Sequence, residues 1–241
     1  MFTQNHFLWL GVCAVAIIVG LVIAKRKNLS AKAAAYIMAA ICLVSEVSKM
    51  ADEIIESDFG GFILNPKALP FHLCSLMIFA VFYIAFTKNE KGKAVVLSFL
   101  APVGILGGIA AMLIPTNGVS FTSLGAYQCF VYHAGLVWYA LYSIIAEHTR
   151  LGLREYGRNI AILGGLFIMD LYVNSVLSAY GTNFMYLVRP PMENLPVLNL
   201  DNGWFAYIGS LLALGIVLMT IVHLPFMIAE AARKKRENKT E

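Results

Sequence analysis

This sequence has few charged residues. Asp, Glu, Lys and Arg make up 13% of the 241 residues, whereas hydrophobic residues make up 59%. Soluble domains carry about 25% charged residues, so a chain this apolar lacks the polar surface that water would require on all sides. We therefore expect lipid as the solvent, in which only helices and closed barrels satisfy every backbone polar group. The apolar runs do not alternate with a period of two residues, which excludes a barrel and predicts an all-α membrane protein.

Three further features that the sequence lacks exclude other classes of protein. No basic residue precedes the first apolar run and three follow it, which is the reverse of a cleaved signal peptide. The four cysteines stand in or at the ends of apolar runs, so a disulfide framework is not expected. The chain shows no fixed-period repeat, no duplicated half and no matching pair of interrupted helices, which are the signature of inverted-repeat transporters.

Seven apolar segments are each close to the ~20 residues that cross a hydrocarbon core of ~30 Å. They cover residues 7–24, 33–51, 69–86, 94–114, 124–146, 159–179 and 204–227. The second is the weakest, because Glu46 and Lys49 interrupt it. We expect residues 1–241 to form a single domain of seven transmembrane helices that ends in a basic tail at residues 230–241.

Basic residues predict the orientation of this domain. They gather after the first, third, fifth and seventh segments, where 15 of the 18 Lys and Arg residues stand. Only Lys49, Lys67 and Arg189 fall on the other side. By the positive-inside rule, the N-terminus should lie outside the cell and the C-terminus in the cytoplasm. The net charge of +4 is then a sign of topology, and we expect no nucleic-acid partner.

Polar side chains within the apolar segments share one depth. A polar group in the bilayer core is costly unless it is paired, so it often marks function. The groups expected toward the outer side are Glu46, Lys49, His72, Cys74, Ser75, Gln128, Cys129, His133, Asp170 and Asn174. The inner halves of the segments read as almost purely apolar. This pattern predicts a pocket that opens toward the outer face.

Each of these groups also has a purely structural interpretation. Glu46 and Lys49 are three residues apart on one helix face and would neutralise each other. Asp170 and Asn174 are four residues apart and would hydrogen-bond neighbouring helices. The glycines between residues 104 and 108 would let the fourth helix pack closely against another. The common depth of the polar groups nevertheless favours a functional site.

Among these groups, Cys74 has the best physical case for a nucleophile. Pro70 is suited to the first turn of a helix, which would place Cys74 near the helix N-terminus, where the helix dipole favours a thiolate. Cys129 is a competing thiol. We expect neither a metal ion nor a cofactor to take part.

A cysteine nucleophile also needs a base. His72 is two residues from Cys74 and would face another side of a regular helix. His133, from a different helix at similar depth, is therefore the better candidate. Asp170 or Glu46 would orient its ring.

Two residue strings carry a resemblance to a known family. They are Leu69-Pro70-Phe71-His72-Leu73-Cys74-Ser75-Leu76 and Gly181-Thr182-Asn183-Phe184-Met185-Tyr186-Leu187, the second followed by Arg189-Pro190. With Gly107-Gly108 before Pro115 and the isolated His133, the chain resembles the YwaF-type family of bacterial integral membrane proteins from about residue 30 to residue 225. That family is similar to animal transmembrane protein 164, a cysteine-dependent phospholipid acyltransferase.

The resemblance implies an enzyme of the bacterial cell membrane that moves an acyl chain between membrane phospholipids through a thioester on cysteine. Cys74 would carry the acyl group and His133 would be the base, with His72 as a further candidate. The lipid would contact Glu46, Asn174, Asn183, Tyr186 and Arg189. Asn183 and Tyr186 match the external loop of the family, and Arg189 would meet a phosphate. The segment 180–203 would be a lid over the site or an ordinary interfacial loop.

Two other classes of function use the same polar groups. A transporter, or a protein that binds lipids or small molecules without catalysis, would need the pocket but not the thiol. A haem protein would use His133 and His148, fifteen residues apart, with His72 and His223 as opposite ligands. His148, however, lies beside Glu147, Thr149 and Arg150, which reads as a water interface. A retinal protein is disfavoured because the last apolar segment contains no lysine.

Overall fold

The computed structural model describes residues 2–56, 61–192, 195 and 197–238. Its α-helices are α1 (Gln4–Arg26), α2 (Ala31–Asp52), α3 (Leu73–Phe86), α4 (Glu90–Leu113), α5 (Leu124–Ile145), α6 (Leu153–Val176) and α7 (Trp204–Glu237). The shorter elements are the antiparallel strands β1 (Ile54–Glu56) and β2 (Phe62–Leu64) and the 3-10 helices η1 (Pro66–Ala68), η2 (Ser178–Tyr180) and η3 (Phe184–Tyr186). The helical class expected from the sequence is confirmed.

Five of the described helices, namely α1, α2, α4, α6 and α7, are long and apolar enough to cross a membrane. Helix α3 has only 14 residues, which is about 21 Å at 1.5 Å per residue. Helix α5 has 22 residues but carries Gln, His and several Tyr side chains among its apolar ones. The chain is therefore a multi-pass membrane protein.

Side-chain caps explain where several helices begin. Thr3, Ser30, Asn89 and Ser123 each accept a hydrogen bond from a backbone N–H in the first turn of α1, α2, α4 and α5, respectively. Such a cap satisfies one of the amides that a helix N-terminus leaves free. Helix α3 begins after His72 without any side-chain cap, so its first amides stay available.

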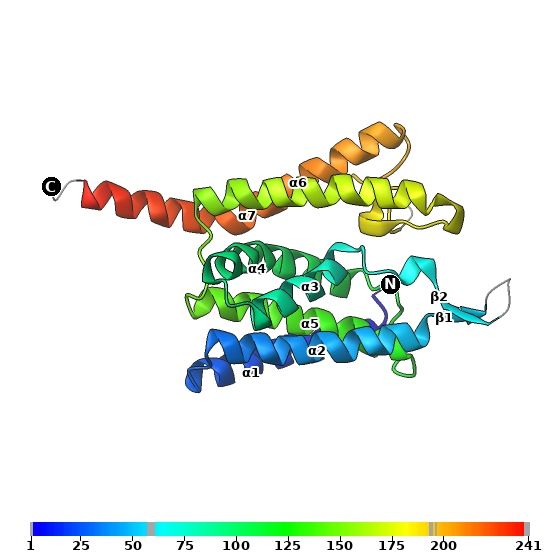
Figure 1. Cartoon of the computed structure of the whole chain (residues 1–241), viewed down its shortest axis with the longest axis horizontal. Coiled ribbons are helices and arrows are strands. Elements are labelled where there is room, and N and C mark those ends of the chain that lie inside the picture. Colours follow the sequence, from blue (N-terminus) through cyan, green and yellow to red (C-terminus); the bar gives the residue numbers. More distant parts are fainter. Residues whose placement is uncertain (1, 57–60, 193–194, 196, 239–241) are drawn as a thin grey trace.

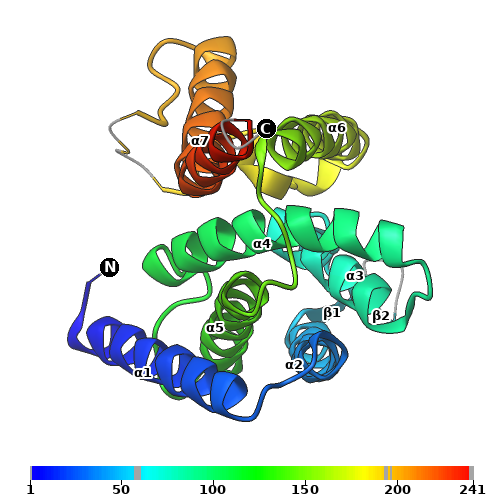
Figure 2. The same ribbon diagram turned by 90° about the vertical axis from the view of Figure 1, so that its left-hand side faces the viewer.

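The helices form two layers. Helices α1 to α5 make the larger layer, and α6 lies beside α7 in the other (Figure 1). Viewed from one end, α5 lies between α1, α2 and α4 (Figure 2). This central position agrees with the buried state of Tyr132, Leu136 and Tyr139 on α5, which belong to the main apolar core. Since protein surrounds most of α5, its buried polar side chains, such as Tyr132 and Tyr139, face other helices in place of lipid.

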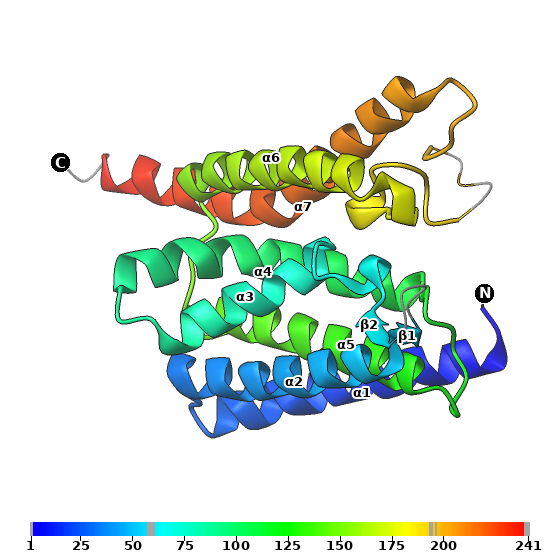
Figure 3. The ribbon, with the colours of Figure 1, turned by 45° about the vertical axis from the view of Figure 1, so that its right-hand side comes forward.

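The two ends of the bundle differ in their connections (Figure 3). The hairpin end carries β1 and β2, η2, η3 and the first turn of α7. The opposite, basic end carries the connections 27–30, 87–89 and 146–152 and the C-terminal end of α7. The expected basic tail runs on as α7 to Glu237, and residues 239–241 lie outside the described residues. Residues 57–60, which connect β1 and β2, also lie outside them.

Glycines set the close contact between α4 and α5. A Cβ atom on Gly108 would lie 2.6 Å from Val137 Cγ2, and one on Gly104 would lie 3.3 Å from atoms of Ala140 and Leu136. A Cβ atom on Gly107 would meet no described atom within 4 Å. The expected packing role is thus met by Gly104 and Gly108, whereas Gly107 lies on another face of α4.

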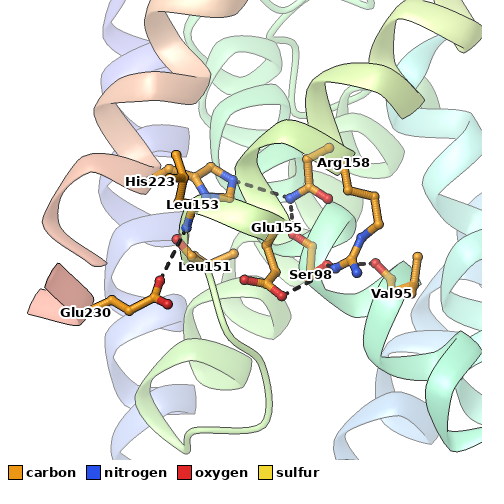
Figure 4. Close-up of polar contacts among 9 residues, drawn as sticks. Val95, Ser98, Leu151, Leu153, Glu155, Arg158, His223 and Glu230 are labelled. Atoms are coloured by element: carbon orange, nitrogen blue, oxygen red, sulfur yellow. Dashed lines mark hydrogen bonds and ion pairs between the residues drawn. The ribbon is translucent and has the colours of Figure 1, made fainter. Parts of the chain in front are cut away.

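A polar cluster joins α4, α6 and α7 near the basic end (Figure 4). Pro102 has no N–H, so it leaves the carbonyl oxygen of Ser98 without its partner inside α4. The side chain of Asn159 donates a hydrogen bond of 2.7 Å to that oxygen, and His223 Nε2 lies 3.3 Å from the same amide nitrogen. Arg158 donates to the Ser98 hydroxyl at 2.6 Å.

This cluster corrects the expectation that the inner halves of the helices are almost purely apolar. Asn159 and His223 are fully buried, and His223 Nδ1 lies 3.0 Å from the carbonyl oxygen of Leu151. Both ring nitrogens of His223 therefore have protein partners. The hydropathy pattern missed the cluster because His223 is a single polar residue within an apolar run and Asn159 stands at the edge of one, next to Arg158.

Candidate functional site

Helix α3 begins later than the sequence predicts. The N–H of Phe71 donates to the carbonyl oxygen of Leu69 at 2.8 Å, which makes a tight turn around Pro70. The first helical residue is Leu73, with His72 as the N-cap. Pro70 thus precedes the helix and does not start it. As a result, Cys74 is the second residue of α3, closer to the N-terminus than expected.

The surroundings of the Cys74 sulfur are polar on the side of the helix terminus. The backbone N–H and the hydroxyl of Ser75 lie within hydrogen-bonding reach of the sulfur. The hydroxyl of Tyr132 on α5 donates to the carbonyl oxygen of Cys74 at 2.5 Å. The cysteine is half-buried, whereas Cys129 is buried. Free amides at a helix N-terminus favour negative charge on a group placed beside them.

His133 is held by its own helix. Its Nδ1 lies 2.7 Å from the carbonyl oxygen of Cys129 and 3.6 Å from the Cys129 sulfur. A carbonyl oxygen can only accept a hydrogen bond, so the proton is on Nδ1 and Nε2 presents a lone pair. Nε2 is buried and has no hydrogen-bond partner among the described residues. The ring is thus fixed in the form that a general base requires.

The two carboxylates expected to orient His133 do not contact it. Glu46 forms an ion pair with Lys49 on its own helix, with 2.8 Å between Oε1 and Nζ. Both oxygens of Asp170 are buried, and no described residue hydrogen-bonds to either. The structural interpretation of Glu46 and Lys49 as a mutually neutralising pair is confirmed. The Lys49 charge is nevertheless close enough to act electrostatically on both His72 and Cys74.

Residues 181–189, here called the cover segment, are anchored by two asparagine side chains. Asn174 on α6 accepts from the N–H of Phe184 at 2.8 Å and donates to the Phe184 carbonyl oxygen at 3.0 Å. Asn183 accepts from the N–H groups of Val188 and Arg189 and donates to the Arg189 carbonyl oxygen. Both amides, expected to contact a lipid, are engaged with the backbone of this segment.

Helix α7 holds the same segment from the other side. Trp204 Nε1 donates to the carbonyl oxygen of Leu187 at 2.9 Å, and the Tyr207 hydroxyl donates to that of Tyr186. Met185 and Tyr186 adopt φ angles of 50° and 57°, a region that costs free energy in residues other than glycine. Two neighbouring residues in this region indicate a backbone that its anchors hold in a strained form.

The cover segment lies against the start of α3. The ring of Phe184 contacts those of Phe71 and His72, with centroids 5.3 and 5.6 Å apart, and the ring of Tyr186 lies 5.3 Å from that of His72. Burial raises the pKa of Tyr186, so its hydroxyl remains protonated at neutral pH. Residues 181–189 therefore cover the N-terminus of α3 as a lid would. The remainder of the expected lid includes residues 193, 194 and 196, which lie outside the described residues.

The structure brings some of the expected site residues together and leaves others apart. Cys74 and His72 share the N-terminus of α3, and the ring of Tyr186 lies against that of His72. Cys129 is the thiol beside His133, and in the described part of the chain no hydrogen bond joins His133 to Cys74. Arg189 is exposed, with its backbone bound to Asn183.

Sequence reasoning did not single out Tyr132, Trp204 or Tyr207 for a role at this site. Aromatic residues are common in membrane helices and at their ends, so their type alone carries no signal. Their roles arise from the carbonyl groups and rings that they meet. Among the described residues, no group of three or more His, Cys, Asp or Glu side chains could hold a metal ion.

A comparison with protein families adds to this geometry. The model of the TMEM164 family matches residues 1–223, which is most of the chain. The chain belongs to the TMEM164 family. Neither the curated proteins nor the solved structures provide a match.

The TMEM164 match extends further than the resemblance seen in the sequence, which began at about residue 30. It includes α1, whose Trp9 stacks on Phe130 of α5 with ring centroids 4.8 Å apart. It also includes α3, the cover segment and α7 as far as His223. The two layers and the segment that covers the start of α3 therefore all belong to the TMEM164 family unit.

Proposed function

We propose that this protein is a membrane lipid acyltransferase that moves an acyl chain between phospholipids through a thioester on Cys74. The observation that carries the proposal is the position of Cys74 as the second residue of an uncapped helix, whose N-cap residue His72 contacts the cover segment. The free amides there would stabilise a thiolate and the oxyanion that forms when it attacks an ester. Membership in the TMEM164 family supports the same chemistry.

In the first half of the reaction, the Cys74 sulfur attacks the carbonyl carbon of an acyl ester in the donor phospholipid. A C–S bond forms and the ester C–O bond breaks. The thiol proton passes to the leaving alkoxide, which departs as a lysophospholipid. His133, with an unprotonated Nε2, is our candidate for the group that carries this proton, and His72 beside the thiol is the second candidate.

In the second half, the hydroxyl of an acceptor lysolipid attacks the thioester carbonyl carbon. A C–O bond forms, the C–S bond breaks and the hydroxyl proton returns to the sulfur. Donor and acceptor are thus both membrane phospholipids. The cations at the hairpin end are Lys49, Lys67 and Arg189, and Arg189, whose side chain is exposed, is our candidate for contact with a lipid phosphate.

We further propose that all seven helices cross a bacterial plasma membrane with the N-terminus outside and the C-terminus in the cytoplasm. The clustering of the basic connections at one end of the bundle supports this orientation. The site then lies in the outer leaflet, near the depth of acyl esters.

Lipid binding or transport without catalysis is the alternative. It is favoured by one observation, namely that in the described part of the chain no histidine is hydrogen-bonded to the Cys74 sulfur. A binding protein would use the same polar groups near the cover segment. It would not need the thiol.

The experiment that separates these functions is intact-protein mass spectrometry on protein purified from its membrane. Wild type, Cys74→Ser and Cys129→Ser are compared after incubation with phospholipids. We expect an acyl-sized mass that neutral hydroxylamine removes, present in wild type and Cys129→Ser and lost only in Cys74→Ser. An adduct lost only in Cys129→Ser would move the nucleophile to the thiol beside His133. Wild type without any adduct would reject the enzyme in favour of lipid binding.

A further inference from the structure

Helix α6 lies wholly within the described residues, and its buried residues are all polar. They are Asn159, Asp170 and Asn174. Their spacings of eleven and four residues place them along one face of the helix. Asn159 binds the Ser98 carbonyl oxygen and Asn174 binds the Phe184 backbone. Asp170 is 0% exposed, yet neither of its oxygens has a hydrogen-bond partner among the described residues. A buried carboxyl group without a partner costs several kcal/mol in an apolar medium.

The cover segment relates Asp170 to Cys74. Asn174 binds the backbone of Phe184, and the ring of the same residue packs on His72. Asp170 lies one helical turn from Asn174, about 6 Å toward the basic end. Cys74 lies two residues from His72 in the same direction, because α3 runs toward the basic end. Asp170 thus lies one turn below the point where α6 binds Phe184, and Cys74 lies about 3 Å below His72, the α3 residue whose ring Phe184 contacts.

We propose that Asp170 binds the free hydroxyl group of the lipid that accepts the acyl chain, an inference that rests on the acyltransferase function proposed above. A carboxylate accepts hydrogen bonds through several lone pairs. The described part of the protein supplies no donor to Asp170, whereas a lipid hydroxyl at the depth of the acyl esters would supply one. An ammonium headgroup would stay nearer the polar surface of the bilayer. The acceptor hydroxyl, in contrast, must reach the depth of the thioester that it attacks.

The contact gives the second half of the reaction a path for its proton. The hydroxyl oxygen forms a bond to the thioester carbonyl carbon while its proton moves to the Asp170 carboxylate. The C–S bond then breaks, and the proton passes from the carboxyl group to the Cys74 sulfur. Thiol and carboxylate are both restored, and no further reactant is required.

Binding measurements test the proposal without any acyl transfer. The probes are 1-palmitoyl lysophosphatidylcholine and its analogue without the glycerol hydroxyl, titrated into wild type, Asp170→Ala and Asp170→Leu, which both lack a hydrogen-bond acceptor at this position. We expect wild type to bind the hydroxyl lipid about 10- to 100-fold more tightly, as for a hydrogen bond to a charged group. Both variants should bind the two lipids equally. Tyr172→Phe, at a position 72% exposed on the same helix, is the control and should match wild type.

Equal affinities in wild type, or a preference that survives in the folded variants, would overturn the proposal. Two variants are used so that destabilisation of one does not decide the result. A second measurement uses Asp170→Asn and follows the acyl group bound to Cys74. This acyl group should transfer to neutral hydroxylamine at the wild-type rate, but to the lysolipid about 100-fold more slowly. If wild type forms no thioester but still prefers the hydroxyl lipid, the enzyme function fails while the binding site stands.

Discussion

Asn174 and Asp170 stand one turn apart on α6 and are both buried, but their surroundings give them opposite roles. Asn174 offers a donor and an acceptor, and the backbone of Phe184 uses both. Asp170 finds no donor in the described part of the chain. A residue type in a membrane helix therefore does not reveal its role, because the role depends on which polar groups of other segments come within reach.

Replacement of Asn174 by Ala should release the cover segment. The N–H and carbonyl groups of Phe184 would lose their partners, and each unsatisfied buried group costs about 1–3 kcal/mol. We expect a loss of about 2–4 kcal/mol in the free energy of unfolding and faster hydrogen exchange across residues 181–189, which mass spectrometry would detect. Asn174→Gln, which retains both the donor and the acceptor, should lose less. Unchanged exchange in this segment would show that Trp204 and Tyr207 suffice to hold it.

At the scale of whole elements, one proline shapes the contact between the two layers. Pro102 withholds an N–H from the Ser98 carbonyl oxygen within α4, and Asn159 of α6 supplies the missing donor. The carbonyl oxygen that Pro102 leaves unpaired in α4 thus serves as an attachment point, because it binds the side chain of Asn159 on α6. The start of α3 follows the same logic, since a tight turn at Pro70 leaves its first amides free beside Cys74.

A double-mutant cycle checks the attachment point. Asn159→Ala should lower the free energy of unfolding by about 1–3 kcal/mol, because it leaves the Ser98 carbonyl oxygen unsatisfied. In a Pro102→Ala background the loss should be smaller, since the alanine that replaces the proline has an N–H that can donate to that oxygen within α4. The coupling between the two substitutions, measured by unfolding in detergent, should be about 1 kcal/mol. Equal losses in both backgrounds would mean that Asn159 stabilises the protein chiefly through His223.

At the scale of the whole molecule, the α6–α7 layer meets the larger layer in two regions. One combines the polar contacts near the basic end with apolar side chains, such as Met219 and Leu163, that join the main core; the other is the cover segment at the hairpin end. The two regions serve different purposes. The first fixes the layers relative to each other, and the second lies over the candidate site. A separate apolar cluster of Leu187, Tyr207 and Ile208 packs the cover segment against α7.

The proposed topology makes a simple labelling prediction. Val197, which is 65% exposed, lies on the connection between η3 and α7, and Lys27 lies on the connection between α1 and α2. In a Cys74→Ser background, a membrane-impermeant maleimide should label Val197→Cys on intact cells and Lys27→Cys only after permeabilisation. The opposite result would reverse the orientation. Labelling of both positions on intact cells would mean that the helices between them do not place the two ends on opposite sides.

Composition and the length of the apolar runs were enough to predict an all-helical membrane chain and the approximate bounds of its helices. Lipid leaves the backbone few alternatives, so hydropathy along the chain carries this information. The candidate thiol at the start of α3 was also predictable, since it depends on local sequence. The turn at Pro70, the anchoring of residues 181–189 and the isolation of Asp170 were decided only in the tertiary structure. Each depends on which helices become neighbours, and an apolar run does not specify its neighbours.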